Sequence, residues 1–210
     1  VMTKSIWVFF ILLININILQ TQVNEDWVAR YNGPGNGIDV PWSITVDESG
    51  NVFVTGQSQG IGTGNDYTTM KYNASGVQQW VSYYNGPGND IDAANSIAID
   101  VSGNVYVTGK SVGSGTDYDY ATIKYSASGI QQWAVRYNVG YDVATEIAVD
   151  ASGNVFVTGH SYGGSITDYD FATIKYNSSG VQQWVQRYNG PGSYYDAANS
   201  LKVDGSGNVY

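Results

Sequence analysis

The stretch "IAIDVSGNVYVTGKS", from Ile97 to Ser111, contains two runs of β-branched, apolar and aromatic residues separated by "DVSGN". Asp, Ser, Gly and Asn favour a tight turn between antiparallel strands. Nearly the same letters return from Ile147 to Ser161 as "IAVDASGNVFVTGHS". A hairpin that recurs in this way indicates a repeat protein built from short strands.

Tryptophan marks the period of this repeat, because it recurs at intervals of 53, 53 and 51 residues, at Trp27, Trp80, Trp133 and Trp184. Each unit contains four strand-like runs, and four antiparallel strands per unit of about 50 residues are the pattern of a β-propeller blade. We therefore predict an all-β chain with about three and a half four-stranded antiparallel blades of an incomplete ring. The predicted blades span about residues 43–84, 96–137 and 146–188, with a strand of the closing blade at 27–32 and the start of another blade at 200–210.

The two quoted stretches resemble the bacterial β-propeller repeat family called SBBP. The resemblance extends from Trp27 to Tyr210, because the motif recurs in register over that length. It implies a propeller in an exported protein, and it implies no particular reaction, since members of the family mostly have no assigned activity. The sequence ends inside the second strand of a unit, so we expect a fragment of a longer exported protein.

The first 22 residues differ from the propeller region at 23–210. Lys4 precedes the apolar run "IWVFFILLININIL", Ile6 to Leu19, which is the pattern of a signal peptide. A membrane anchor is the alternative, but the run is shorter than the ~20 apolar residues that a membrane span needs. We therefore predict a secreted or cell-surface protein without membrane insertion after signal processing.

Charge and composition exclude several classes of function. The formal net charge of −9 disfavours nucleic acid as a partner, because phosphate neutralisation requires basic patches. The chain has no cysteine, which removes thiolate catalysis and Cys-ligated zinc. No nucleophile elbow, zinc-protease motif or phosphate loop is present in the sequence. We therefore expect no cofactor other than calcium.

Residues that recur in every unit are expected to be structural. Aspartate recurs at the tight turns and in the long loops, at Asp47, Asp100, Asp150 and Asp204 and at Asp39, Asp92, Asp142 and Asp196. A catalytic centre instead needs a set of different groups in one place. His160 is the only histidine, at the position that Gln57 and Lys110 hold in other units, and we predict an exposed loop-edge residue without a catalytic role.

Pairs of alternate aspartates form a candidate calcium site, at Asp90 and Asp92, Asp117 and Asp119, and Asp168 and Asp170. On an extended chain, alternate side chains face the same side, about 7 Å apart, so two carboxylates of a pair can share a cation. Calcium takes six to eight oxygen ligands, as a rough guide, so such a site would also need backbone carbonyls or a neighbouring blade. Solvated turn residues are the alternative.

Aromatic residues are interleaved with these acids on the long-loop face, at Trp42, Tyr118, Tyr141, Tyr162, Tyr169, Tyr194 and Tyr195. Flat apolar rings with a polar edge, beside acidic hydrogen-bond acceptors, suit a neutral glycan or a protein ligand. We therefore predict a non-enzymatic binding or display module. The alternative is part of an exported polysaccharide-acting enzyme, a lyase or hydrolase, with its catalytic residues on missing blades or in another domain.

Overall fold

The computed structural model describes residues 25–164, 168–192 and 194–210. The predicted signal peptide, residues 1–22, lies outside this part of the chain. The described residues form twelve β-strands and no helix. Accordingly, no helix of the described part is long and apolar enough to cross a membrane.

The strands form three four-stranded antiparallel sheets, which we call blades 1, 2 and 3. Blade 1 contains β1 (Asp39–Val46), β2 (Val52–Gln59), β3 (Asn65–Tyr72) and β4 (Gln78–Tyr84). Blade 2 contains β5 (Asp92–Ile99), β6 (Val105–Val112), β7 (Tyr118–Tyr125) and β8 (Gln131–Tyr137). Blade 3 contains β9 (Asp142–Val149), β10 (Val155–Gly164), β11 (Asp168–Tyr176) and β12 (Gln182–Tyr188). The prediction of an all-β chain of propeller blades is confirmed.

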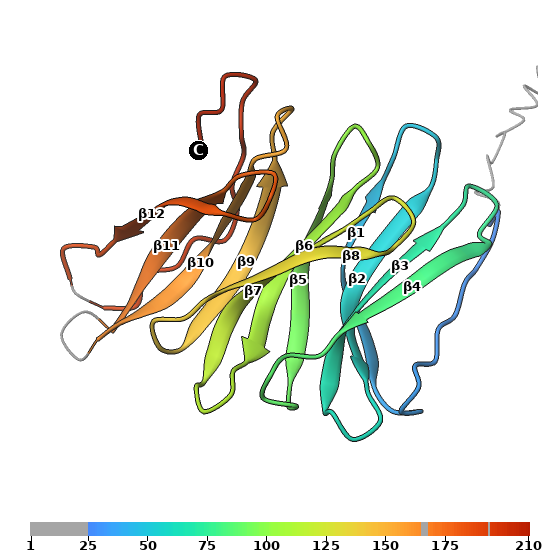
Figure 1. Ribbon diagram of the computed structural model, residues 1–210, viewed down its shortest axis with the longest axis horizontal. Helices are drawn as coiled ribbons and strands as arrows, with labels where there is room; N and C mark the ends of the chain where they lie inside the picture. Colours follow the sequence, from blue (N-terminus) through green and yellow to red (C-terminus); the bar gives the residue numbers. More distant parts are fainter. Residues whose placement is uncertain (1–24, 165–167, 193) are drawn as a thin grey trace, which may run out of the picture.

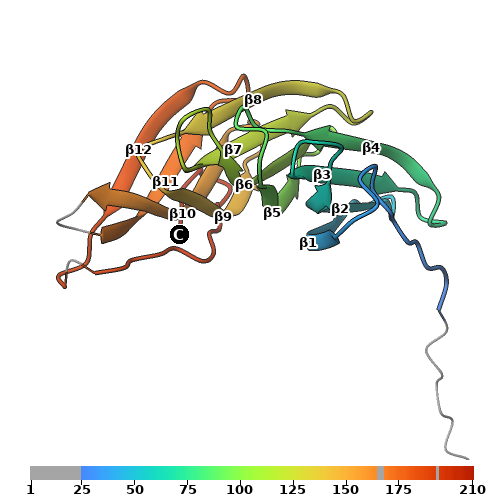
Figure 2. The same ribbon diagram turned by 90° about the horizontal axis from the view of Figure 1, so that it is seen from below.

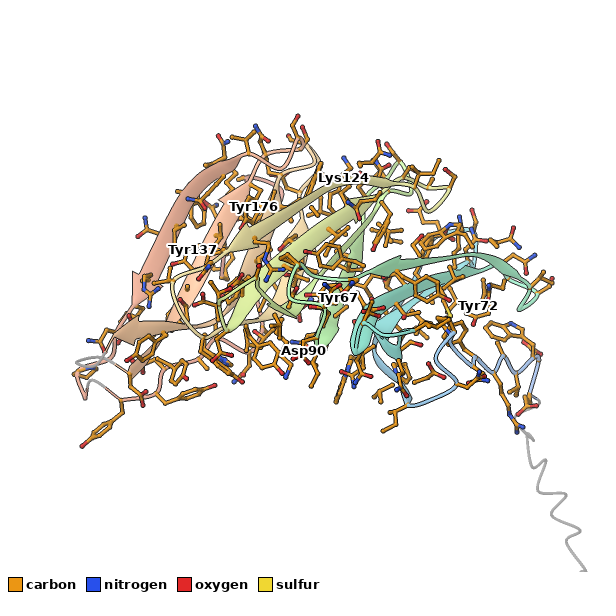
Figure 3. All side chains as sticks on the ribbon, turned by 60° about the horizontal axis from the view of Figure 1, so that its bottom comes forward. Tyr67, Tyr72, Asp90, Lys124, Tyr137 and Tyr176 are labelled. Carbon is orange, nitrogen blue, oxygen red and sulfur yellow. The ribbon has the colours of Figure 1, made fainter. Side chains whose placement is uncertain are left out.

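The three blades stand side by side in chain order, as Figure 1 shows. Viewed from below, in Figure 2, they form an arc, and the ring is not closed. The first strands contact one another along the inner side of this arc, β1 with β5 and β5 with β9. The fourth strands β4, β8 and β12 form the outer edges. Each blade therefore presents its loops at two opposite ends, which Asp90 and Lys124 mark in Figure 3.

The first strand of every blade begins four residues before the predicted start. The predicted starts were residues 43, 96 and 146, whereas β1, β5 and β9 begin at 39, 92 and 142. Each of these strands continues through a register shift, at Trp42, Asn95 and Thr145. An extra residue of this kind interrupts the alternation of side chains between the two faces of a strand. The sequence pattern therefore shows only the part of the strand that follows the bulge.

The two predicted partial blades are not formed as strands. Residues 25–33 form no strand, although 27–32 have the pattern of β4 and β8. Residues 200–210 form a turn closed by one isolated bridge, between Val203 and Val209. A strand needs the backbone groups of a neighbouring strand as hydrogen-bond partners. Among the described residues, neither segment lies beside a further strand of its own blade.

The core of the molecule lies between the blades. Phe53 and Tyr67 of blade 1 are fully buried against blade 2, where they meet Ile97, Val107 and Ile123. The Tyr67 hydroxyl, labelled in Figure 3, donates to the Ala121 carbonyl oxygen at 3.1 Å. Burial of apolar side chains is the main stabilising contribution to folding. Each blade therefore depends on its neighbours for its core.

A tryptophan links blade 1, and another links blade 2, to the third-to-fourth-strand turn of the blade that follows it. The indole nitrogen of Trp80 donates to the Ala127 carbonyl oxygen at 3.1 Å, and that of Trp133 donates to Ser178 at 3.1 Å. Trp27 makes the equivalent hydrogen bond to Ala74 at 3.2 Å, although its segment forms no strand. Trp27 therefore occupies the position of a fourth-strand tryptophan without the strand.

An arginine joins the outer strand of blades 2 and 3 to its surroundings. Arg136 on β8 forms an ion pair with Asp119, at 2.7 Å, and donates to the Ser111 carbonyl oxygen at 2.6 Å. The same guanidinium donates to the Tyr84 hydroxyl of blade 1 at 3.2 Å. Arg187 on β12 repeats these contacts with the corresponding residues, Asp170, Ser161 and Tyr137. Each arginine on a fourth strand therefore contacts the second and third strands of its own blade and the fourth strand of the preceding blade.

Candidate ligand-binding site

Five of the seven predicted aromatic residues meet at the long-loop end of blades 2 and 3. We call them, together with His160, the aromatic cluster: Tyr118, Tyr141, Tyr162, Tyr169, Tyr195 and His160. They come from β7, β10, β11 and the two loops that lead into and out of blade 3. The cluster therefore combines residues that are up to 77 positions apart in the sequence, from Tyr118 to Tyr195.

The buried Asp142 and the half-buried Asp196 hold the two loop tyrosines in place. Tyr141 directly precedes Asp142, whose carboxylate accepts hydrogen bonds from the backbone N–H of Val139 and Gly140 at 2.7 and 3.2 Å. Tyr195 precedes Asp196, which accepts a hydrogen bond from the Gly190 N–H and donates its own backbone N–H to the Tyr169 carbonyl oxygen at 2.7 Å. The first set of hydrogen bonds holds the loop that leads into β9, and the second set holds the loop after β12 against β11 of blade 3.

The tyrosine rings of the cluster form a continuous row of contacts. The ring centroids of Tyr118 and Tyr141 are 5.3 Å apart, those of Tyr141 and Tyr169 are 5.8 Å apart, and those of Tyr169 and Tyr195 are 5.4 Å apart. The first two pairs are nearly perpendicular, at 87° and 82°. Edge-to-face contact is a favourable arrangement for aromatic rings, because the positive edge of one ring meets the negative face of the other.

His160 lies within the cluster, so the prediction of an exposed loop-edge residue is wrong. Its Nδ1 atom is 3.0 Å from the Tyr195 hydroxyl oxygen, and its ring stacks on Tyr141 with an interplanar angle of 14°. Burial lowers the pKa of His160 from its ordinary value of 6.5, against the opposing effect of Asp142. The imidazole is therefore neutral at neutral pH, and it can exchange a hydrogen bond with a hydroxyl group.

A hollow of about 440 Å³ opens beside the cluster, lined by Thr116, Asp117, Asn138, Gly140, Tyr141, Tyr162 and Tyr169. Its wall combines tyrosine rings with hydroxyl, amide and carboxylate groups. Lys110 lies next to it, with its ammonium nitrogen 4.4 Å from the centroid of the Tyr118 ring. Apolar walls with a few polar groups are typical of sites for small organic ligands.

The other two predicted aromatic residues do not join the cluster. Trp42 lies at the bulge of β1 in blade 1 and is 57% exposed. Tyr194 is 79% exposed, and Gly192 is its neighbour in the same loop. Both residues were predicted because aromatic residues are interleaved with acids in the long loops. This composition does not show which blade junction a side chain joins.

The predicted calcium pairs consist of one buried and one exposed aspartate each. The second members are engaged by protein donors: Asp92 by the backbone N–H groups of Gly86 and Val112, and Asp119 and Asp170 by the arginines. Asp90, Asp117 and Asp168 are exposed. Within the described ranges, no group of three or more His, Cys, Asp or Glu side chains lies close enough together to hold a metal ion. Calcium binding by these pairs stays a prediction.

A larger hollow, of about 530 Å³, lies on blade 1 and has a different character. It is lined mainly by apolar side chains, among them Ile44, Val54 and Met70. These residues have the strand positions that Ile97, Val107 and Ile123 have in blade 2, where blade 1 covers them. The hollow on blade 1 therefore has the chemistry of a blade-to-blade contact, and it is a weaker candidate for a ligand site than the aromatic cluster.

Comparison with protein families identifies the repeat. The family model described as the SBBP beta-propeller repeat matches residues 26–62 and 79–115. These two stretches begin before a first strand and end after a second strand, so they correspond to equivalent parts of successive blades. No curated protein matches the chain.

Two solved structures are similar to part of this chain at low sequence identity. A eukaryotic initiation factor is 10% identical with a TM-score of 0.46, and the match covers 71% of this chain and 32% of that chain. A fucose lectin from Kordia zhangzhouensis, solved with methyl-fucoside, is 14% identical with a TM-score of 0.41. That match covers 70% of this chain and 99% of the lectin. The propeller assignment rests on the repeat match and on the three sheets.

Proposed function

We propose that this chain of SBBP propeller repeats is a non-enzymatic binding module that holds a neutral glycan at the aromatic cluster. The observation that carries the proposal is the convergence of five tyrosines and His160 beside the 440 Å³ hollow. Strand pairing in the propeller scaffold fixes Tyr118, Tyr162, Tyr169 and His160. Hydrogen bonds of Asp142 and Asp196 hold the loops that carry the other two tyrosines. Such a scaffold presents a ligand site without a cost for ordering it on binding.

The chemistry of the cluster favours a neutral, hydroxyl-rich ligand. Tyrosine rings offer flat apolar surfaces to the C–H faces of a sugar, and their hydroxyl groups exchange hydrogen bonds with sugar hydroxyls. Asn138 and Thr116 add an amide and a hydroxyl group to the same wall. The net charge of −9 disfavours polyanions by repulsion.

Location at the cell surface or outside the cell is part of the proposal. It is supported by the apolar run from Ile6 to Leu19 that follows Lys4. An exported module of this kind would meet glycans of the surroundings or of a cell surface. A protein ligand that presents aromatic and hydroxyl groups is the other partner compatible with this surface.

The test is binding of the full chain to a glycan array, with and without calcium. We expect binding of neutral glycans, and we expect Tyr169→Ala to weaken it at least about tenfold, because stacking on an aromatic ring contributes on the order of 1 kcal/mol or more. Tyr194→Ala is the matched control, since Tyr194 is a tyrosine of the same face outside the cluster. Binding only to polyanions, or equal binding by the Tyr169 and Tyr194 variants, would contradict the proposal.

A polysaccharide-acting enzyme is the second candidate function, and one observation favours it. The imidazole of His160 and the hydroxyl of Tyr195, 3.0 Å apart, are a hydrogen-bonded pair able to move a proton between them. Incubation of the wild-type chain with each bound polysaccharide, followed by chromatography of the products, separates the two functions. Release of shorter chains that stops in His160→Gln would show the enzyme.

A further inference from the structure

The aromatic cluster contains the same arrangement twice. Tyr118 and Tyr169 lie at equivalent positions of β7 and β11, since Val112 pairs with Tyr118 and Tyr162 pairs with Tyr169. Tyr141 and Tyr195 are also equivalent, because each directly precedes the first aspartate of the following unit. The two resulting pairs have similar ring separations, with centroids 5.3 Å apart in the first and 5.4 Å apart in the second, and their interplanar angles are 87° and 58°.

A nitrogen-containing side chain lies beside each tyrosine pair, at the same strand position in both blades: Lys110 in blade 2 and His160 in blade 3. Lys110 pairs with Tyr120 in β7, and His160 pairs with Phe171 in β11, so the two occupy the same strand position. Lys110 lies over the ring of Tyr118, at 4.4 Å, and His160 contacts the ring of Tyr169, at 5.6 Å. Each copy therefore consists of two tyrosines and one nitrogen group that donates or exchanges hydrogen bonds.

Blade 1 does not carry this arrangement. Its residues at the three positions are Gln57, Asn65 and Ile91. The repeat therefore does not require the tyrosine pairs for folding, because blade 1 forms the same four strands without them. The two copies are a property of the blade 2 and blade 3 junctions, and they are linked into one row by the contact between Tyr141 and Tyr169 at 5.8 Å.

We propose, resting on the glycan-binding function above, that this row binds an extended oligosaccharide whose successive units occupy two equivalent subsites. Tyr118 and Tyr141 form the first subsite, and Tyr169 and Tyr195 form the second. A polymer of identical units meets the same chemistry at each step along its length, so a duplicated protein site fits it. A single terminal sugar would use only one of the two copies.

Two linked contacts also explain why the row would favour a longer chain. Once one unit is bound, the next unit is held near the second subsite at a high effective concentration. The affinity for a ligand that reaches both subsites therefore exceeds the affinity for a ligand that reaches one. We expect the affinity to rise at least about tenfold, because linking two binding events typically raises the overall affinity by a factor on the order of 10² or more.

The experiment is calorimetric titration of the full chain with three series of neutral oligosaccharides, the cello-, laminari- and chito-oligosaccharides, from monosaccharide to hexasaccharide. We expect Kd to fall at least about tenfold with length in one series and then to level off. Tyr118→Ala and Tyr195→Ala should each remove this gain, so that long ligands bind no better than short ones. Tyr194→Ala should retain the gain, and unchanged melting temperatures of all three variants verify their folding.

The outcomes separate this inference from the function on which it rests. Binding with the same Kd for short and long ligands overturns the two-subsite inference and leaves glycan binding in place. A length-dependent gain that survives both Tyr118→Ala and Tyr195→Ala also overturns it. The absence of binding to every probe here and to every glycan of the array overturns the proposed function together with the inference.

Discussion

Blade 1 and blade 2 have the same four strands in the same register, but their buried third-strand acids have different surroundings. In blade 2, Asp119 is paired with Arg136, which also reaches Tyr84 of the preceding blade. In blade 1 the equivalent acid, Asp66, is 7% exposed and accepts a hydrogen bond from Thr63 at 2.8 Å. Tyr83 stands at the position of the arginine, and its hydroxyl bonds to that of Tyr31.

This difference shows that the strands and the junctions depend on different residues. Strand order and register are the same with arginine or tyrosine at the outer position. The charge balance at the junction is not the same, because Asp119 has the guanidinium of Arg136 beside it and Asp66 accepts a hydrogen bond from the neutral Thr63. Burial raises the pKa of both carboxyl groups, and Arg136 opposes this effect only at Asp119. One outer-strand residue therefore decides whether a buried carboxylate has a counter-charge.

Removal of the arginine from blade 2 should have the largest effect. Arg136→Met leaves Asp119 buried without its partner, which should lower the free energy of unfolding by about 3 kcal/mol or more. Urea denaturation followed by tryptophan fluorescence measures the change. Arg30→Met is the matched control, because Arg30 also lies three residues after a tryptophan but is exposed, and it should change little. A loss below about 1 kcal/mol for Arg136→Met would contradict the role of the ion pair.

A second comparison uses the turn glycines below the tryptophans. Gly76 and Gly129 both have positive φ, +77° and +82°, and a Cβ atom at either would lie 2.6 Å from a tryptophan ring. Trp80 lies in β4, whereas Trp27 lies in a segment that forms no strand, so we expect the ring of Trp27 to shift more easily. We expect Gly129→Ala to lower the free energy of unfolding by about 3 kcal/mol and Gly76→Ala to lower it by about 1 to 2 kcal/mol. Both substitutions strain the backbone at a positive φ, and only Gly129→Ala also presses a Cβ atom against a fixed tryptophan ring. Equal losses in urea denaturation would mean that both tryptophans are equally fixed.

Introduction of the arginine into blade 1 should stabilise it. Tyr83→Arg places a guanidinium group beside Asp66 and Ser58, and we expect a gain of about 1 kcal/mol at pH 7. The gain should shrink on acidification, because a protonated Asp66 has no charge for the guanidinium group to pair with. The ordinary pKa of this carboxyl group, 3.8, applies to the unfolded chain, so both states become protonated at low pH. Tyr83→Met serves as the control for loss of the tyrosine. If the two variants have the same stability at pH 7, blade 1 cannot accept the arginine contacts of blade 2.

The smallest effect is expected from His160→Gln, which gives blade 3 the residue of blade 1. Because burial lowers the pKa of His160 in the folded protein, the unfolded chain takes up a proton first as the pH falls below 6.5. The neutral imidazole therefore stabilises the folded protein fully above pH 6.5. This stabilisation decreases as the pH falls from 6.5 to the lowered pKa of the folded protein. The melting temperature of the wild type should fall in this interval more than that of the variant. Parallel pH profiles would place His160 in solvent.

Local signals allowed most of the fold to be predicted from the sequence. The tight turn of blade 2 is predictable because Asp100 accepts hydrogen bonds from the backbone of Ser102 and Asn104, and these interactions involve neighbours in the sequence. The start of β5 at Asp92 was not predictable, because the bulge at Asn95 is held by a contact with the next blade, from its side-chain amide to the Ala144 carbonyl oxygen at 2.8 Å.

The candidate site was predictable in its residue types and not in its grouping. Tyr162 and His160 lie two residues apart on β10, and alternate residues of a strand face the same side, so the cluster could have been extended to His160. The separation of Tyr195, which joins it, from Tyr194, which does not, depends on how Asp196 holds its loop. Such a contact between distant segments has no signature in a single sequence.

The tryptophan links described above also bear on how such a chain can evolve. The indoles of Trp27, Trp80 and Trp133 each donate to a backbone carbonyl of the next repeat. The main chain can supply this acceptor at any residue, as Ala74, Ala127 and Ser178 illustrate. A recombination event that duplicates or deletes one whole repeat would leave every remaining donor opposite an acceptor. The gene can therefore gain or lose repeats in single steps, and residues at the strand and loop ends, such as the paired tyrosines, can diverge afterwards in each copy.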